Sequence, residues 1–90
     1  MKLTPYHAED YLKTPEDIKV YLNASFATKD SQLIAKALGD VAKIKGMSQI
    51  AKETKLDRSS LYNSLTKQGD PKLSTITKLI EAFGLSLTVH

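Results

Sequence analysis

Ninety residues, 41% of them hydrophobic and 26% charged, are enough for one small globular domain and leave no room for a second. The chain has no cysteine, which excludes disulfides and thiolate metal sites, and no apolar run of the roughly 20 residues that span a bilayer. Residues 1–30 hold four basic and five acidic side chains, whereas residues 43–67 hold six basic and two acidic ones, a net charge of +4. This basic block suits a surface that faces phosphate, although a solvated lysine-rich face would have the same composition.

Catalytic and metal-binding patterns are not found. His7 and His90 lie near the two ends, and no histidine lies near a nucleophile in the middle of the chain. Residues 1–5 contain one lysine and no following apolar stretch, so no signal peptide is expected. We therefore expect a cytoplasmic protein that is not an enzyme, binds no cofactor or metal and does not enter a membrane.

Capping residues and apolar spacing predict five helices. The first begins at Pro15 after the capping residue Thr14 and ends near residues 25–29. The second runs from Asp30, as its cap, to about Lys45, and Gly39 within it allows close packing of another helix. Two short helices follow at about 48–54 and 58–65, and a last one, capped by Ser74, ends at Gly84.

Residues 85–90 alternate apolar and polar side chains, as a β-strand does. No other segment has a clear strand pattern, so the best partner is the same tail of a second chain. This pairing predicts a homodimer in which Leu85, Leu87 and Val89 form the interface. The alternative is a frayed terminus without a partner.

Residues 47–65 have the layout of a helix-turn-helix. Ala51 is small where the two helices would cross, and Ser48 and Asp57 are placed to cap them. Apolar positions that would face the core are Ile50, Leu56, Leu61 and Leu65. Lys55 departs from the usual pattern because it takes a turn position where glycine is common and positive φ is needed.

The exposed side of the second short helix carries the types of side chain that read DNA. Arginine can bind guanine and asparagine adenine in the major groove, whereas serine, tyrosine and helix N-terminal amides bind phosphates. The predicted DNA-binding residues are Ser48, Gln49, Arg58, Ser59, Ser60, Tyr62, Asn63 and Lys67. The alternative is that the helix pair only packs and its outer polar side chains keep it soluble.

Blocks of residues in order over most of the chain form one pattern: Tyr11-Leu12, Pro15-Glu16, Tyr21-Leu22-Asn23, residues 37–42, residues 46–49, Arg58, Ser60-Leu61-Tyr62, Gly69-Asp70-Pro71, Thr75 and residues 83–87. In these blocks the chain resembles the HigA-like antitoxins, the helix-turn-helix antidotes of bacterial addiction modules. The resemblance implies a type II antitoxin that neutralises a RelE/ParE-like toxin and represses its own operon by binding operator DNA. The predicted fold is a small five-helix, all-α, lambda-repressor-like domain, and the alternating tail adds a short strand paired across a dimer.

Three segments then have separate expected roles: residues 1–29 contact the toxin, residues 30–84 bind DNA, and residues 85–90 dimerise. RNA-cleaving toxins tend to be basic, so an acidic and aromatic arm is complementary to them. The candidate toxin-binding residues are Tyr6, Tyr11, Glu16 and Asp17. Two alternatives stay open: a free-standing transcription regulator without a toxin, and a toxin-binding protein whose helix-turn-helix is only a scaffold.

Overall fold

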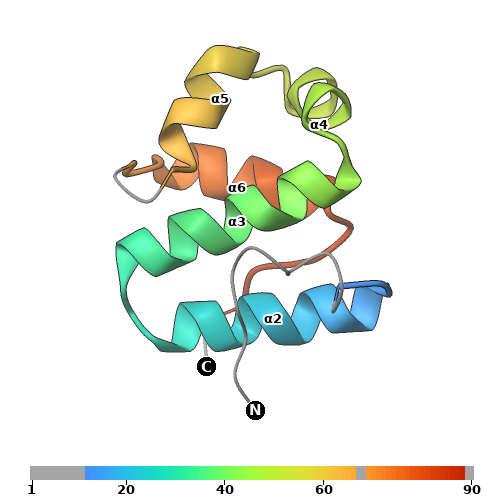
Figure 1. Ribbon diagram of the computed structural model, residues 1–90, viewed down its shortest axis with the longest axis vertical. Coiled ribbons are helices and arrows are strands. Elements are labelled where there is room, and N and C mark those ends of the chain that lie inside the picture. The colour runs from blue at the N-terminus through green and yellow to red at the C-terminus, as the bar shows by residue number, and fades with distance from the viewer. Residues whose placement is uncertain (1–11, 67–68, 89–90) are drawn as a thin grey trace.

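The computed structural model describes residues 12–66 and 69–88, which fold into five helices (Figure 1). The helices are α2 (Pro15–Ala27), α3 (Ser31–Lys45), α4 (Met47–Thr54), α5 (Arg58–Ser64) and α6 (Leu73–Ala82). No strand occurs among these described residues. The predicted all-α class is confirmed, and each predicted helix is present with nearly the expected boundaries.

The first two helices begin at the predicted caps. The hydroxyl of Thr14 accepts a hydrogen bond from the backbone amide of Asp17 at 3.1 Å, and the Asp17 carboxylate accepts one from the amide of Thr14 at 3.2 Å. Asp30 accepts a hydrogen bond from the amide of Gln32 at 3.0 Å at the start of α3. Both caps satisfy amides that have no partner within the helix.

Two other predicted caps are wrong. Gly46, with a φ of 103°, is the single residue between α3 and α4. Helix α4 begins directly after it, so Ser48 lies inside the first turn. Helix α6 begins after Lys72, whose extended backbone occupies the cap position, so Ser74 is also inside its helix. A serine caps only where its own backbone is extended, and neither serine meets that condition.

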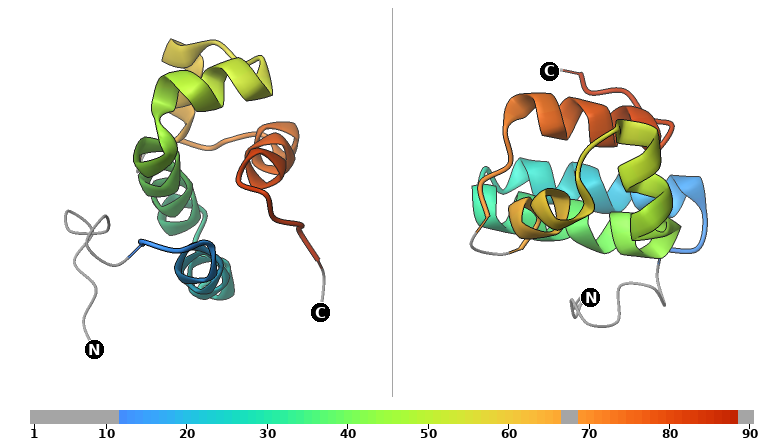
Figure 2. Two further views of the ribbon diagram at one scale, coloured as in Figure 1. Left: turned by 90° about the vertical axis from the view of Figure 1, so that its right-hand side faces the viewer. Right: turned by 90° about the horizontal axis from the view of Figure 1, so that it is seen from above.

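Helix α2 and the pair α4–α5 lie at opposite ends of the longest axis (Figure 1), and α3 and α6 lie between them (Figure 2). Helix α3 packs on α2 and on α4, and α4 also packs on α5 and α6. The core is therefore shared by all five helices. Its largest fully buried side chains are Leu38, Val41, Ile50, Leu61 and Leu79.

A polar contact fixes α2 on α3. The hydroxyl of Tyr21 donates to the carboxylate of Asp40 at 2.8 Å, and the ammonium of Lys36 lies 3.4 Å from the other oxygen of that carboxylate. Burial, with a smaller contribution from Asp40, raises the pKa of Tyr21 well above its ordinary value. The phenol therefore stays a hydrogen-bond donor throughout the neutral range.

The C-terminal strand is predicted to pair with a second copy of the chain, and that pairing stays a prediction. Residues 85–88 form no strand, and Val89 lies outside the described residues. The segment leaves α6 and runs towards the end of the molecule where α2 lies, with Leu85 packed against the core and Leu87 45% exposed (Figures 1 and 2). A strand exists only when a second backbone pairs with it, and an alternating sequence does not supply that backbone.

Gly39 lets the end of α5 approach α3 closely; the sequence predicted close packing at this glycine but not which helix packs there. A Cβ atom at Gly39 would lie 2.8 Å from the carbonyl oxygen of Leu65 and 3.3 Å from its Cβ. Real Cβ atoms do not approach a backbone oxygen so closely, so any side chain at Gly39 would displace Leu65. Leu65 is 5% exposed and belongs to the core.

Gly39→Ala should therefore destabilise the fold although alanine is the better helix former. Overpacking costs about 1–3 kcal/mol, which exceeds the gain of up to about 1 kcal/mol in helix propensity. Urea denaturation should show a lower free energy of unfolding. Asn23→Ala on the exposed side of α2 is the control, because it improves propensity without a new contact. A Gly39→Ala protein as stable as the wild type would show that Leu65 moves aside at no cost.

Candidate nucleic-acid interface

The turn between α4 and α5 depends on a left-handed residue. Lys55 has φ 61° and ψ 28°, and the following amide, of Leu56, donates to the carbonyl of Ala51 at 3.2 Å. Asp57 then caps α5, since its carboxylate accepts from the amide of Ser60 at 3.0 Å. Both features were expected from the sequence. Lys55 adopts the left-handed conformation that glycine usually supplies at such a turn, and Asp57 is the predicted cap of α5.

The inner faces of α4 and α5 are buried as predicted. Ile50 and Leu61 are each 1% exposed, and Leu56 is partly buried against the same core. The sequence did not indicate Thr54, which is also buried. Its hydroxyl donates to the carbonyl of Ile50 at 2.7 Å, which removes the cost of burying a polar group at the end of α4.

The outer face of the same pair is polar and exposed to solvent. Of the predicted DNA-binding residues, those that the structure describes are all exposed: Ser48, Gln49, Arg58, Ser59, Ser60, Tyr62 and Asn63. Lys67 lies outside the described residues. The set comes from the first turn of α4 and from α5, so it shares one end of the molecule, opposite α2 (Figures 1 and 2).

This end of the molecule is positively charged. Residues 43–66 contain five basic and two acidic side chains, and all seven are exposed. The basic ones are Lys43, Lys45, Lys52, Lys55 and Arg58. A surface with excess positive charge beside exposed hydrogen-bonding groups attracts a polyanion.

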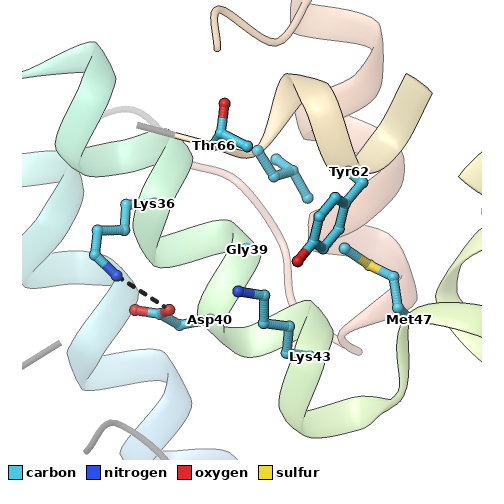
Figure 3. A pocket seen from close by; sticks show the side chains of 8 residues that line it. Lys36, Gly39, Asp40, Lys43, Met47, Tyr62 and Thr66 are labelled. Carbon is cyan, nitrogen blue, oxygen red and sulfur yellow. Dashed lines mark hydrogen bonds and ion pairs between the residues drawn. The ribbon is translucent and has the colours of Figure 1, made fainter. Parts of the chain in front are cut away.

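A pocket of about 220 Å³ opens between α3 and α5 (Figure 3). Its lining residues are Lys36, Gly39, Asp40, Lys43, Met47, Tyr62, Leu65 and Thr66. The ammonium of Lys43 lies 5.6 Å from the centre of the Tyr62 ring, within range of a cation–π interaction. This contact could not be predicted from the sequence, because the two residues lie on different helices and no spacing rule connects them.

The candidate toxin-binding residues that the structure describes lie apart from this interface. Glu16 is exposed in the first turn of α2, at the opposite end of the molecule. The Asp17 carboxylate is engaged in the α2 cap and accepts from the amides of Lys13 and Thr14 at 3.2 Å each. Tyr6 and Tyr11 lie outside the described residues.

Other classes of site find no support in the described part of the chain. No group of three or more histidine, cysteine, aspartate or glutamate side chains there could hold a metal ion. His7 and His90 are outside it. None of the described helices is long and apolar enough to cross a membrane.

Comparison with known proteins assigns the family. Residues 2–90 match the model of a family described as "Probable addiction module antidote protein". The chain belongs to this antidote family. An uncharacterized protein of Haemophilus influenzae is 34% identical over 89 residues, which cover 99% of this chain and 92% of that protein. No solved structure matches the chain.

Membership makes the chain an antidote rather than an enzyme, as the sequence predicted, and an antidote implies a cognate toxin. The family description does not extend to the HigA-like group, to a class of toxin or to DNA. The prediction of DNA binding rests on the residues themselves, whereas the HigA-like group and the class of toxin rest on the resemblance described above.

Lys55 gives a stability prediction for the turn. Because a side chain at positive φ is strained, Lys55→Gly should raise the free energy of unfolding by about 0.5–1 kcal/mol. Lys52→Gly, within α4, is the matched control and should lower it by about 1 kcal/mol. Thermal and urea unfolding of both variants provide the measurement. If Lys55→Gly is the less stable protein, the left-handed turn is not strained.

Proposed function

We propose that this antidote binds its own operator DNA through a helix-turn-helix formed by α4 and α5, and neutralises a RelE/ParE-like toxin through residues 1–29. The observation that supports DNA binding is the exposed outer face of α5, where Arg58, Tyr62 and Asn63 adjoin a surface with excess positive charge. Helix α5 would lie in the major groove, with Arg58 and Asn63 contacting base edges. Ser48, Gln49 and the serines of α5 would contact phosphates.

Repression follows from the same contact. A protein bound over its own promoter excludes RNA polymerase, so the antidote would limit the synthesis of both gene products. The two alternatives from the sequence make different predictions. A free-standing regulator would bind the same DNA without any toxin partner, whereas a scaffold would bind the toxin and no DNA.

Binding to the DNA upstream of the gene tests the proposal. Arg58→Ala with Asn63→Ala should weaken specific binding by about 1–3 kcal/mol for each base contact, measured as the Kd for the upstream duplex. Lys19→Ala with Asn23→Ala is the matched control, because it removes the same types of group from the exposed face of α2. Equal affinities of the two double variants would favour the scaffold. If the wild type binds only after the neighbouring gene product is added, that product acts as co-repressor.

Toxin binding is proposed for residues 1–29, where the exposed carboxylate of Glu16 would attract a basic toxin. Glu16→Lys should slow association with the protein encoded beside the gene, roughly tenfold at low salt, because charges at an interface act mainly on the association rate. Glu81→Lys, exposed on α6, makes the same charge change elsewhere. Unchanged association of Glu16→Lys, measured by stopped-flow fluorescence, would place the toxin on another surface. Asp17 is a poor choice for this test, because its carboxylate also forms one half of the capping box of α2.

Dimerisation is proposed for the tail, with Leu85, Leu87 and Val89 pairing with the same residues of a second copy. The support is the course of residues 85–88, which form no helix and lead away from α4 and α5, and the exposure of Leu87 (Figure 2). The tail runs away from α4 and α5, so a tail-to-tail dimer would leave both DNA-binding faces open (Figure 2). Such a dimer would read a pseudo-palindromic operator with half-sites about 10 bp apart or a multiple of that.

Shortening the chain to end at Gly84 should give monomers in sedimentation equilibrium. Because Leu85 also packs on the core, Leu87→Asp is the cleaner variant and should have the same effect with an unchanged helical spectrum. Dimers of either variant would contradict the pairing of tails.

A further inference from the structure

The pocket between α3 and α5 is lined by a lysine, Lys43, that is not among the DNA-binding residues named above. We propose that Lys43 and Tyr62 together bind a backbone phosphodiester of DNA at the rim of this pocket. The inference rests on the proposed function and extends the interface from α4 and α5 to the last turn of α3. It adds a contact that fixes the register of α5 but reads no base.

Lys43 is placed for this role by what surrounds it. Its ammonium lies over the Tyr62 ring at 5.6 Å, is exposed, and forms no ion pair within residues 12–66 and 69–88. The carboxylate in the same pocket, of Asp40, is already held by the ammonium of Lys36 and the hydroxyl of Tyr21. The positive charge of Lys43 is therefore not neutralised inside the protein.

Tyr62 contributes a hydroxyl to the same rim. Its side chain is 51% exposed, and both its hydroxyl and the Lys43 ammonium point into the space between α3 and α5 (Figure 3). An ammonium and a phenol hydroxyl are both donors, and a phosphodiester oxygen accepts from each. The cation–π contact also limits the positions that the long lysine side chain can take, so less entropy is lost on binding.

The charge of the pocket favours an anion over a cation or an apolar peptide. Its lining contains two lysines and one aspartate, and the aspartate is paired. The rim is continuous with the outer face of α5 through Tyr62, which belongs to both. A DNA strand that follows α5 would therefore pass its backbone across Lys43.

The test is the salt dependence of binding to two labelled duplexes, the upstream sequence and a scrambled sequence of equal length. Each lysine–phosphate contact adds about 0.9 to the slope of log Kd against log salt concentration, so Lys43→Gln should reduce the slope by about that amount on both duplexes. Lys43→Arg should restore it. Lys19→Gln on α2 removes one charge at the other end of the molecule and should leave the slope unchanged.

Tyr62→Phe keeps the ring under the ammonium and removes only the hydroxyl. It should weaken binding to both duplexes by about tenfold, the effect of one hydrogen bond to a charged group, with the slope unchanged. Because Lys43 and Tyr62 are exposed, the unfolding midpoints should stay at the wild-type value, which separates a binding effect from a folding effect.

Steep binding by the wild type together with equal slopes for Lys43→Gln and Lys19→Gln would overturn the inference and leave the proposed function intact. A loss confined to the upstream duplex would assign Lys43 to a base and also overturn it. Unchanged DNA binding with weaker binding of the neighbouring gene product would assign the pocket to a protein partner. If the wild type binds neither duplex at any salt concentration, the proposed function fails with it.

Discussion

The contact of Leu65 with Gly39 is the constraint on which the arrangement at the basic end of the molecule depends. The Leu65 carbonyl would lie 2.8 Å from a Cβ at Gly39, so the missing side chain lets the end of α5 rest directly on α3. Leu61 and Leu65 are held in the core by this approach, and the outer face of α5 turns to solvent. The same approach brings the centre of the Tyr62 ring to 5.6 Å from the ammonium of Lys43. Close packing at one glycine thus determines which side chains the protein presents at this end.

The two ends of the molecule are suited to different partners, and the core connects them. The segment from the last turn of α3 to the end of α5 carries excess positive charge and hydrogen-bonding groups, whereas α2 lies at the far end, fixed to α3 by the contact between Tyr21 and Asp40. An antidote that holds a toxin at one end would leave the other free for DNA. Under the proposed function, toxin and operator can bind one molecule together, so the toxin can modulate repression without competing for the same surface.

Local features were predictable from the sequence, and contacts between distant segments were not. Thr14 and Asp30 cap helices because their side chains reach amides two or three residues ahead, which spacing alone reveals. The start of α4 was misplaced because the φ of 103° at Gly46, rather than the nearest serine, determines where the helix begins. The contact between Lys43 and Tyr62 joins two helices and follows no periodicity. A strand that needs a second chain cannot form in one chain, whatever its pattern.

Nuclear magnetic resonance can show directly whether α4 and α5 form the DNA-binding surface. The backbone amide shifts of the ¹⁵N-labelled protein would be followed while the upstream duplex is added. The largest changes are expected at residues 48–49 and 58–63 and at Lys43, with α2 unaffected. Changes confined to α2, or no change at DNA concentrations that saturate a specific binder, would contradict the assignment of the DNA-binding surface to α4 and α5.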